Sequence, residues 1–508
     1  MTTGSRPGAD AGPAAGARLP SRPDVIVIGG GVAGAAAARL LAGWGHLVLL
    51  AERELSRPPL AESLPPSCIP LLEQVGVRDA VDAAGFLRGG GNTVWWGGEP
   101  MRVEPFPGGR LGYQVVRDRL ETVLGAAAEA AGAVRVRPAT ALGVRRGDDA
   151  HEVELSLPDG RIVVRAPWVL DCSGRAGVVA RAFRVAPPDG VRTIALVGVW
   201  ERHGGWGLPD ESHTLVESAD WGWGWSVPVT PERRFFTAMV DPGRTPVAAG
   251  PRMTERYEEL FAALPALGPV MRAGARAGDA WACEASPYHS SEVAFPGMLL
   301  VGDAASMIDP LSSFGVKKAL ASAWLAAVTV HTALVTPANT EAAATLFRER
   351  EAAYVHSAAG TLGGLSRDAA AGRGVPFWSA RADMQEGDGE WGAIERLRRD
   401  PEVLAAFHAL RERPAARLTT ANGVPRELLP VVRGNVVVRE EHLVLPGIDG
   451  GVRYLRSVDL LAVLDIAPRH EDVGDMYAHY ARSFGPVPLP DFLGALSVLV
   501  AKGCTTIA

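Results

Sequence analysis

Residues Asp24 to Arg53, DVIVIGGGVAGAAAARLLAGWGHLVLLAER, decide the fold of this chain. Val25 to Ile28 form a short β-branched run, which is typical of a buried parallel strand. Gly29, Gly31 and Gly34 follow at the GxGxxG spacing, and an alanine-rich helix comes directly after them. Strand, glycine turn and helix in this order predict a dinucleotide-binding cradle, in which free N–H groups at the start of the helix face a pyrophosphate.

The cradle ends in an acidic residue that narrows the choice of cofactor. Leu47 to Leu50 are predicted to form its second strand. Glu52 follows about twenty residues after the glycines, where a carboxylate accepts hydrogen bonds from a ribose. An acid at this place favours FAD or NAD over a cofactor with a 2′-phosphate, and we assign Arg53 to the same site. A glycine cluster alone often marks an ordinary turn, but here strand, helix and acid agree.

The composition is that of an ordinary enzyme and argues against several other classes. Of 508 residues, 47% are hydrophobic and 21% are charged, and this length allows roughly two to four domains. The net charge of -6 shows no excess of basic residues, so nucleic acid is not an expected partner. Four cysteines stand far apart without a CxxC pair, which predicts neither a metal site nor disulfides and fits a reducing cytoplasm.

The N-terminal residues 1–22 are predicted to be a disordered tail. They are rich in Gly, Ala, Pro and Arg and lack the apolar core of a signal peptide. Outside the cradle no stretch approaches roughly 18 apolar residues, so no membrane span is expected.

Two further stretches are predicted to contact the cofactor. Arg117 stands at the start of a predicted helix, where its guanidinium can reach a phosphate; a surface ion pair is the alternative. Later, a buried strand at Met298 to Val301 leads to Asp303 and then, through Ser313 and Gly315, into a long helix. We expect Asp303 to bind a ribityl hydroxyl group and the start of the helix to face the anionic edge of a reduced flavin.

The tryptophans are candidates for the wall of a substrate pocket. Trp221, Trp223 and Trp225 alternate with glycines, so all three are predicted to point to one face of a strand and to leave the other face open to close backbone approach. Trp96 lies beside Trp95 in a glycine-rich segment, where either ring can face a pocket or the core. We assign Trp96, Trp223 and Trp225 to the pocket, with core packing as the alternative.

The predicted fold class is α/β. A Rossmann-like FAD-binding domain over 23–357 carries an antiparallel β-sheet substrate region at about 191–290. Helical patches over 358–425 have no assigned chemistry. Residues 426–508 give three short strands and then three amphipathic helices, which predicts a winged-helix-like C-terminal domain.

Together these motifs resemble the flavoprotein hydroxylase superfamily over residues 24–355. Residues 223–228, WGWSVP, are similar to the WxWxIP motif of flavin-dependent halogenases, with Val in place of Ile. Residues 307–315, MIDPLSSFG, resemble their FxxPxxSxG motif, with Met in place of Phe. The resemblance implies FAD, molecular oxygen as co-substrate and an aromatic substrate.

Two departures from the halogenase pattern favour hydroxylation. The family's lysine, which carries or steers hypohalous acid, falls at Gly89 with Arg88 beside it, and arginine offers a planar fork and no neutral amine. The glutamate of the tryptophan halogenases falls at Ser312. Oxygen transfer from a flavin C4a-hydroperoxide needs no such lysine. The sequence therefore resembles more closely the halogenase-related monooxygenases, including flavoproteins that hydroxylate a peptidyl tryptophan during assembly of tryptophan-derived quinone cofactors.

The resemblance implies an FAD-dependent monooxygenase that hydroxylates an electron-rich aromatic ring, such as a tryptophan of a peptide or protein. No residue is identified as the general base; His213 and His289 are candidates, although lone histidines are more often structural. The expected electron donor is NAD(P)H, directly or through a flavin reductase. One alternative is a halogenase that uses Lys317 or Lys318, which are more readily explained as helix residues. The other is a non-catalytic flavin-binding or peptide-binding maturation factor.

The C-terminal domain resembles small winged-helix modules that capture leader sequences of ribosomally made peptides. From Arg433 to Lys502 the chain has 7 basic and 9 acidic residues, which is not a DNA-binding balance. Addition of a peptide to an edge strand suits such a module. A domain that caps the pocket or forms a dimer contact is the alternative.

Overall fold

The computed structural model describes residues 20–54, 58–187, 191–247, 251–370, 375–382, 397, 400–412, 415, 418–421, 423–448 and 450–507. Most of the predicted tail at 1–22 lies outside these residues. The chain divides into two compact units. The first contains Met1–Leu334 and Phe347–Glu386, and the second contains Val335–Leu346 and Gly387–Ala508. The mixed α/β class predicted from the sequence is confirmed.

The first unit is built on a six-stranded sheet with the order β21-β22-β12-β1-β2-β8. Its strands are β1 (Val25–Ile28), β2 (Val48–Ala51), β8 (Val134–Val136), β12 (Trp168–Asp171), β21 (Ala294–Phe295) and β22 (Met298–Leu300). All neighbours from β22 to β8 are parallel, and β21 is an antiparallel edge. Helix α1 (Val32–Gly43) packs against α4 (Arg117–Ala130). Every residue of β1, β2 and β12 is buried, as expected of a sheet covered on both faces.

Small antiparallel sheets surround this core. One of them is a meander of β9 (Thr140–Arg145), β10 (His151–Leu157) and β11 (Gly160–Ala166). A second sheet has the order β3-β7-β4, with β3 (Ala61–Leu64), β4 (Leu87–Gly89) and β7 (Gly112–Val116). A third joins β13 (Arg184–Val185), β20 (Tyr288–Ser290) and β23 (Ser306–Met307). The helices α2 (Ile69–Val75) and α3 (Arg78–Ala83) lie between β3 and β4 in the chain.

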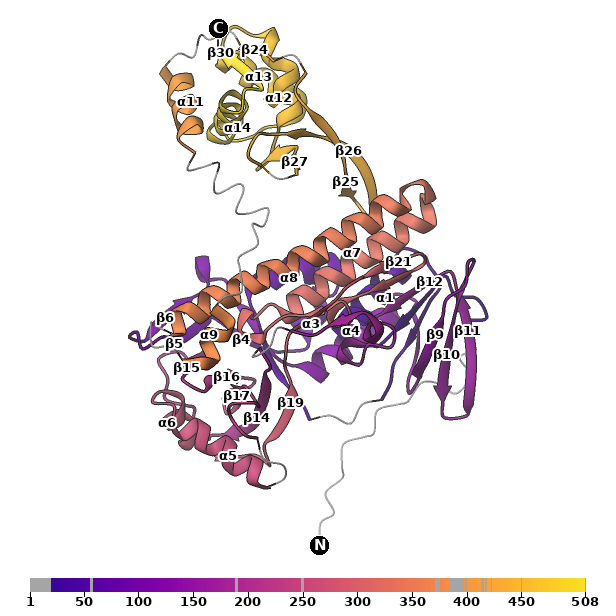
Figure 1. Cartoon of the computed structure of the whole chain (residues 1–508), viewed down its shortest axis with the longest axis vertical. Coiled ribbons are helices and arrows are strands. Elements are labelled where there is room, and N and C mark those ends of the chain that lie inside the picture. Colours follow the sequence, from indigo (N-terminus) through magenta and orange to yellow (C-terminus); the bar gives the residue numbers. More distant parts are fainter. Residues whose placement is uncertain are drawn as a thin grey trace. The chain divides into compact units, whose positions relative to one another are not determined.

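An eight-stranded sheet forms a further layer of the first unit (Figure 1). The predicted insert supplies β14 (Ile194–Glu201), β15 (Thr214–Ala219), β16 (Gly222–Pro228), β17 (Arg233–Val240), β18 (Ala275–Arg276) and β19 (Trp281–Glu284). The sheet also recruits β5 (Gly91–Trp95) and β6 (Arg102–Pro105), because β5 pairs with β15 in parallel. Helices α5 (Pro251–Ala262) and α6 (Leu267–Arg272) cover one of its faces.

Two long helices follow the last parallel strand. Among the described residues, α7 (Gly315–Val335) is the one single helix long and apolar enough to cross a membrane, and 72% of its apolar window is buried inside the protein. Helix α8 (Thr340–Ala370) is continuous, so the boundary predicted at 357 falls inside a helix. It is followed by α9 (Pro376–Ala382) and α11 (Pro401–Glu412). Within the helical patches predicted over 358–425, residues 371–374, 383–396, 398–399, 413–414, 416–417 and 422 lie outside the described residues.

The second unit contains a sheet with the order β25-β26-β27 and three helices in the predicted succession. The strands are β25 (Arg426–Arg433), β26 (Val436–Val444) and β27 (Gly451–Val452), and the helices are α12 (Leu460–Ile466), α13 (Val473–Phe484) and α14 (Leu489–Ala501). Two short pairs join β28 (Tyr454–Leu455) to β29 (Val458–Asp459), and β24 (Leu418–Thr420) to β30 (Thr505–Ile507). The winged-helix interpretation stays a prediction.

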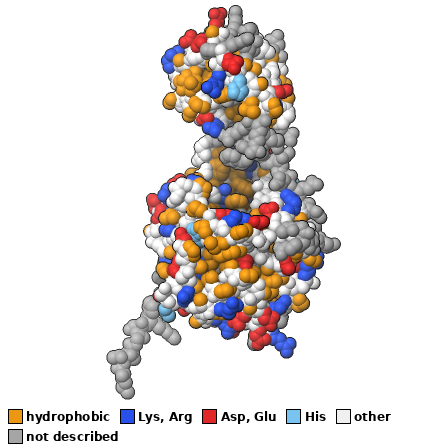
Figure 2. Space-filling view, turned by 90° about the vertical axis from the view of Figure 1, so that its left-hand side faces the viewer, with side chains coloured by type: hydrophobic (Ala, Val, Ile, Leu, Met, Phe, Trp, Pro, Cys, Tyr) orange, Lys and Arg blue, Asp and Glu red, His pale blue; other side chains and the backbone are white. Residues whose placement is uncertain are grey.

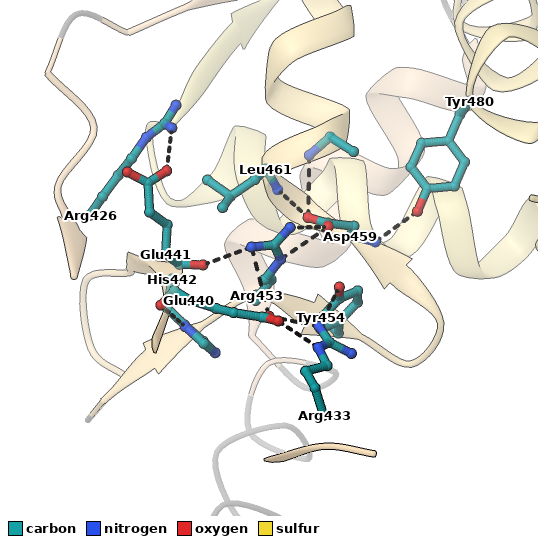
Figure 3. A network of polar contacts seen from close by, with 11 residues as sticks. Arg426, Arg433, Glu440, Glu441, His442, Arg453, Tyr454, Asp459, Leu461 and Tyr480 are labelled. Carbon is teal, nitrogen blue, oxygen red and sulfur yellow. Dashed lines mark hydrogen bonds and ion pairs between the residues drawn. The ribbon is translucent and has the colours of Figure 1, made fainter. Parts of the chain in front are cut away.

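A polar network ties the hairpin of the second unit to its helices (Figure 3). Asp459 caps α12 by accepting hydrogen bonds from two backbone N–H groups, and it pairs with Arg453 at 2.9 Å. Arg433 of β25 pairs with Glu440 of β26 at 2.5 Å. The Tyr480 hydroxyl accepts a hydrogen bond of 2.8 Å from the backbone N–H of Asp459.

The surface and the thiols bear on the function. Figure 2 shows basic and acidic side chains interspersed among hydrophobic ones on the face in view. All four cysteines are free thiols. Within the described ranges, no group of three or more His, Cys, Asp or Glu side chains is placed to hold a metal ion.

Candidate functional site

Close backbone contacts fix the glycine turn after β1. Gly29 has a φ of 103°, and a Cβ there would lie 2.5 Å from the carbonyl oxygen of Cys172. A Cβ on Gly34 would lie 1.8 Å from the carbonyl oxygen of Gly29, so only glycine lets α1 pack against the turn. Gly31 occupies the N-cap position of α1 and has no side chain that could accept hydrogen bonds from the first N–H groups of the helix. The first N–H groups of α1 are therefore oriented toward an anion from outside the helix.

A groove with a volume of about 620 Å³ runs over this turn. Six of the predicted cofactor residues line it: Gly29, Gly31, Glu52, Arg53, Arg117 and Asp303. Gly34 lies beneath the groove, inside the contact between α1 and the turn. The fold thus brings three distant parts of the chain to one surface.

Glu52 is held in the groove by two arginines that sequence reasoning missed. Its carboxylate lies 2.7 Å from Arg135 and 3.6 Å from Arg137, and both arginines line the groove. A carboxylate has about four lone-pair sites, so Glu52 keeps acceptors for ribose hydroxyl groups. Arg135 lies within β8 and Arg137 follows it, and no motif surrounds them. Only the pairing of β2 with β8 places both arginines beside Glu52.

Arg117 begins α4 and is shared by two carboxylates. Its guanidinium lies 3.1 Å from Glu121 and 3.5 Å from Glu62. Burial lowers the pKa of Arg117, but the nearby carboxylates of Glu62, Asp303 and Glu121 outweigh it and leave the pKa raised. Burial raises the pKa of Glu62, against the opposing effect of Arg117. Arg117 is therefore both ion-paired and placed in the groove.

A smaller cavity adjoins the groove and is called here the inner cavity. The two share Val32, Arg117, Asp303 and Ala319. The apolar part of the inner wall includes Trp225, Met307, Ile308 and Pro310, and the ionisable part includes Glu62, Cys68 and Lys317. The predicted residues Ser313 and Gly315 also line it. Burial raises the pKa of the Cys68 thiol to about 12, so this thiol is neutral near pH 7.

The turn that carries Asp303 is held by side chains from two sides. The Lys318 ammonium of α7 donates to the carbonyl oxygens of Gly302 and Ser306, both at 2.6 Å. The Tyr288 hydroxyl donates to the carbonyl oxygen of Asp303 at 2.6 Å, and the N–H of Gly302 donates to Ser322 at 2.9 Å. The backbone of this turn is therefore fixed before any ligand binds.

These residues fit a dinucleotide with a flavin at one end. The uncapped start of α1 suits a pyrophosphate, Glu52 suits a ribose, and the inner cavity lies where the ring of the cofactor would follow. A family model described as "FAD binding domain" matches residues 22–353, which is more than half of the chain. The chain belongs to the FAD-binding domain family.

Relatives of this FAD-binding chain confirm the resemblance to the flavin halogenase-like flavoproteins. A tryptophan 2-halogenase of Chondromyces crocatus is 32% identical over 349 residues, and this match spans 62% of each chain. The structure of CmlS, a flavin-dependent halogenase, aligns with a TM-score of 0.74 at 18% identity and covers 96% of both chains. The structure of QhpG, a peptidyl tryptophan dihydroxylase essential for tryptophylquinone cofactor biogenesis, aligns with a TM-score of 0.65 at 20% identity. It covers 95% of this chain and 99% of that one. The match thus spans less than two thirds of the curated relative, and the two structures show the shared fold.

Of the three tryptophans assigned to the pocket, one lines the inner cavity and two pack in the core. Trp225 lines the inner cavity, and Trp223 is only 2% exposed and packs edge-on behind it, with ring centroids 5.5 Å apart. Trp96 is buried, donates its indole N–H to the carbonyl oxygen of Leu365 at 2.9 Å and stacks edge-on against Trp378. Neither Trp96 nor Trp223 lines the groove or the inner cavity.

Two details of the predicted tryptophan row are wrong. Trp221 precedes β16 and packs with the hydrophobic cluster under α5 and α6, whereas Trp223 and Trp225 belong to the opposite cluster. The glycine face of the strand is not bare, because a Cβ on Gly224 would lie 2.7 Å from the Leu264 side chain. The missing side chain at Gly224 makes room for the segment that contains α5 and α6, and not for a ligand.

The structure explains why the positions aligned with halogenase residues lack their functional groups. Gly89 is buried, and a Cβ there would lie 2.6 Å from the side-chain amide of Gln114. Arg88 pairs with Asp82 at 3.0 Å and stacks over Tyr113. Ser312 is buried and donates to the carbonyl oxygen of Asp309 at 2.8 Å. None of these three residues lines the groove or the inner cavity.

Neither histidine that was a candidate for the general base lines the groove or the inner cavity. His213 is buried between Thr93 and Asp210, and His289 is exposed on β20 outside both cavities. The ionisable groups in the inner cavity are instead Glu62 and Lys317 beside the predicted Arg117 and Asp303. Glu62 lies in β3, where no sequence motif marked it. Lys317 was named from the sequence only as a helix residue or as the amine of the halogenase alternative.

Proposed function

We propose that this chain is an FAD-dependent monooxygenase that hydroxylates an electron-rich aromatic ring, in particular a tryptophan side chain of a peptide or protein. The inner cavity is the observation that carries the proposal. Its wall combines the Trp225 ring, the Met307 side chain and a charged rim that includes Glu62, and it adjoins the cofactor groove. The flavin ring would enter this cavity from the groove, and an aromatic substrate ring, which has apolar faces and a polar edge, would meet it at the mixed wall around Trp225.

The comparisons support an aromatic and peptide-bound substrate. The similar proteins include a tryptophan 2-halogenase and a peptidyl tryptophan dihydroxylase. The likeness to the dihydroxylase extends over 95% of this chain, so it includes most of the second unit. We propose that the second unit captures the peptide that carries the substrate, through main-chain pairing at an edge strand.

Each group of residues has a task in the proposed reaction. FAD, when bound and reduced, supplies the oxidising chemistry together with molecular oxygen. The groove binds the cofactor through the start of α1, Glu52 and Arg117, and the apolar wall around Trp225 excludes water. Replacing a ring hydrogen releases a proton, and the Glu62 carboxylate lines the cavity where it can accept that proton. A raised pKa improves Glu62 as a proton acceptor near neutral pH.

Halogenation of the same kind of substrate is the second candidate function. Two observations favour it: the tryptophan 2-halogenase match and the position of Lys317 in the inner cavity. The absence of an amine at Gly89 favours hydroxylation, because the space there is filled by Gln114.

Mass spectrometry of products distinguishes the two. FAD-loaded protein is supplied with NADPH, a flavin reductase, oxygen, bromide and tryptophan peptides encoded near its gene. A gain of one or two oxygens that does not depend on bromide supports hydroxylation. A bromide-dependent halogen adduct overturns it in favour of halogenation. Stopped-flow reduction with NADPH alone shows whether a reductase is needed, and a protein that is never reduced would be a binding factor.

A further inference from the structure

Lysine is rare in this chain, and its three copies occupy different environments. Lys502 of the second unit pairs with Asp400 at 2.7 Å. Lys318 is buried and donates to the two carbonyl oxygens of the Asp303 turn. Lys317 is partly exposed and lines the inner cavity. The roles of Lys318 and Lys502 are explained by their partners, and that of Lys317 is not.

Lys317 goes against the local preference of its helix. It lies in the first turn of α7, where the positive end of the helix dipole disfavours a cation. Its amine is 5.0 Å from the centre of the exposed Phe314 ring, and among the described residues it makes no hydrogen bond or ion pair. The positive end of the α7 dipole and an amine without an ion pair therefore lie at the same cavity.

Arg117 is the other cation among the described residues that line the inner cavity, and it is already ion-paired. Arg117 is held by Glu62 and Glu121. The Lys317 charge favours the ionised form of the neighbouring Cys68 thiol, yet burial keeps that thiol neutral. Lys317 is thus the cation of this cavity that is free to meet a ligand with negative charge.

We propose that Lys317 is the residue whose positive charge stabilises the reduced flavin ring in the inner cavity and so raises the reduction potential of the bound cofactor. The inference rests on FAD binding in the groove and inner cavity and is independent of whether the product is hydroxylated or halogenated. Two-electron reduction adds negative charge to the pyrimidine side of the ring, and a nearby cation favours that charged form. The Glu62 carboxylate, on the same wall, disfavours the negative charge of the reduced ring.

The test is the midpoint potential of bound FAD, measured by slow enzymatic reduction beside reporter dyes. Lys317→Met removes the charge and keeps the length of the side chain. We expect it to lower the two-electron equilibrium constant about tenfold, which corresponds to a fall of about 30 mV. Lys317→Arg keeps the charge and is expected to retain the wild-type potential. Glu62→Gln is expected to shift the potential in the opposite direction.

Controls separate this role from a structural one. Lys502→Met removes a lysine in the second unit and is expected to leave the potential unchanged. The dissociation constant for FAD and the melting temperature of each apoprotein are measured first, and the potential is measured at saturating FAD. An unchanged potential in Lys317→Met, or an equal fall in Lys317→Arg, would refute the proposal. If FAD binds but no aromatic substrate is oxidised, the proposed function fails while the potential still decides the role of Lys317.

Discussion

Replacing Lys318 by methionine is expected to destabilise the first unit and to weaken FAD binding. The Lys318 ammonium is 1% exposed and lies 3.6 Å from the Glu351 carboxylate, which is 4% exposed. The same ammonium donates to the carbonyl oxygens of Gly302 and Ser306. Methionine fills a similar volume but leaves a buried carboxylate and two carbonyl groups without their donor.

The size of the effect follows from the buried charge. Breaking a buried ion pair by removing one partner costs about 3–5 kcal/mol, because the remaining charge is uncompensated. The lost hydrogen bonds from the ammonium belong to the same cost and are not added to it. We therefore expect the free energy of unfolding of the first unit to fall by about 3–5 kcal/mol.

A double variant separates stability from positioning. In Lys318→Met with Glu351→Leu both charges are gone, and replacing a buried ion pair by apolar residues is often neutral or stabilising. We expect urea unfolding of the apoprotein to return close to the wild-type midpoint. FAD binding, followed by quenching of flavin fluorescence, stays weakened about tenfold or more, because the turn that carries Asp303 still lacks the ammonium.

Either of two results would refute this reasoning. If the single variant unfolds at the wild-type urea concentration, the pair is not buried as a charged pair. If the double variant binds FAD as tightly as the wild type, Lys318 does not position the Asp303 turn and serves only the stability of α7 and α8.

Three further outcomes are expected. Gly34→Ala places a methyl group against the carbonyl oxygen of Gly29 and should lower FAD affinity more than tenfold by equilibrium dialysis, whereas Gly364→Ala, with only one atom as near as 3.9 Å, should leave it unchanged. Trp225→Ala should weaken binding of an aromatic substrate more than it weakens FAD binding, whereas Trp96→Ala should cost about 3–5 kcal/mol of stability by urea unfolding. The raised pKa of Glu62 means that its charge is unfavourable in the folded state. The stability advantage of Glu62→Gln over wild type should therefore grow from pH 5 to pH 8 and disappear on acidification, and calorimetry showing the reverse trend would contradict this.

The sequence by itself determined the cradle and the class of cofactor. The GxGxxG turn, Glu52 and the alternation of strand and helix are local patterns, and the contact that requires Gly34 is with Gly29, only five residues away. The order of strands and helices in the second unit was also predictable, since hydrophobic periodicity is local. Trp225 lines the inner cavity, and its assignment to a substrate pocket stays a prediction.

Only the tertiary structure decided which side chains share the cavity. Trp96 and Trp223 stand beside glycines in the sequence, as Trp225 does. Trp96 is buried against Trp378 and Trp223 is buried behind Trp225, so neither lines the cavity. Glu62 and Lys317 come from segments far apart in the sequence, and neither belongs to a pattern that marks chemistry. Long-range packing of β3, α4 and α7 sets their positions and the burial that shifts the pKa of Glu62, and no local spacing encodes that packing.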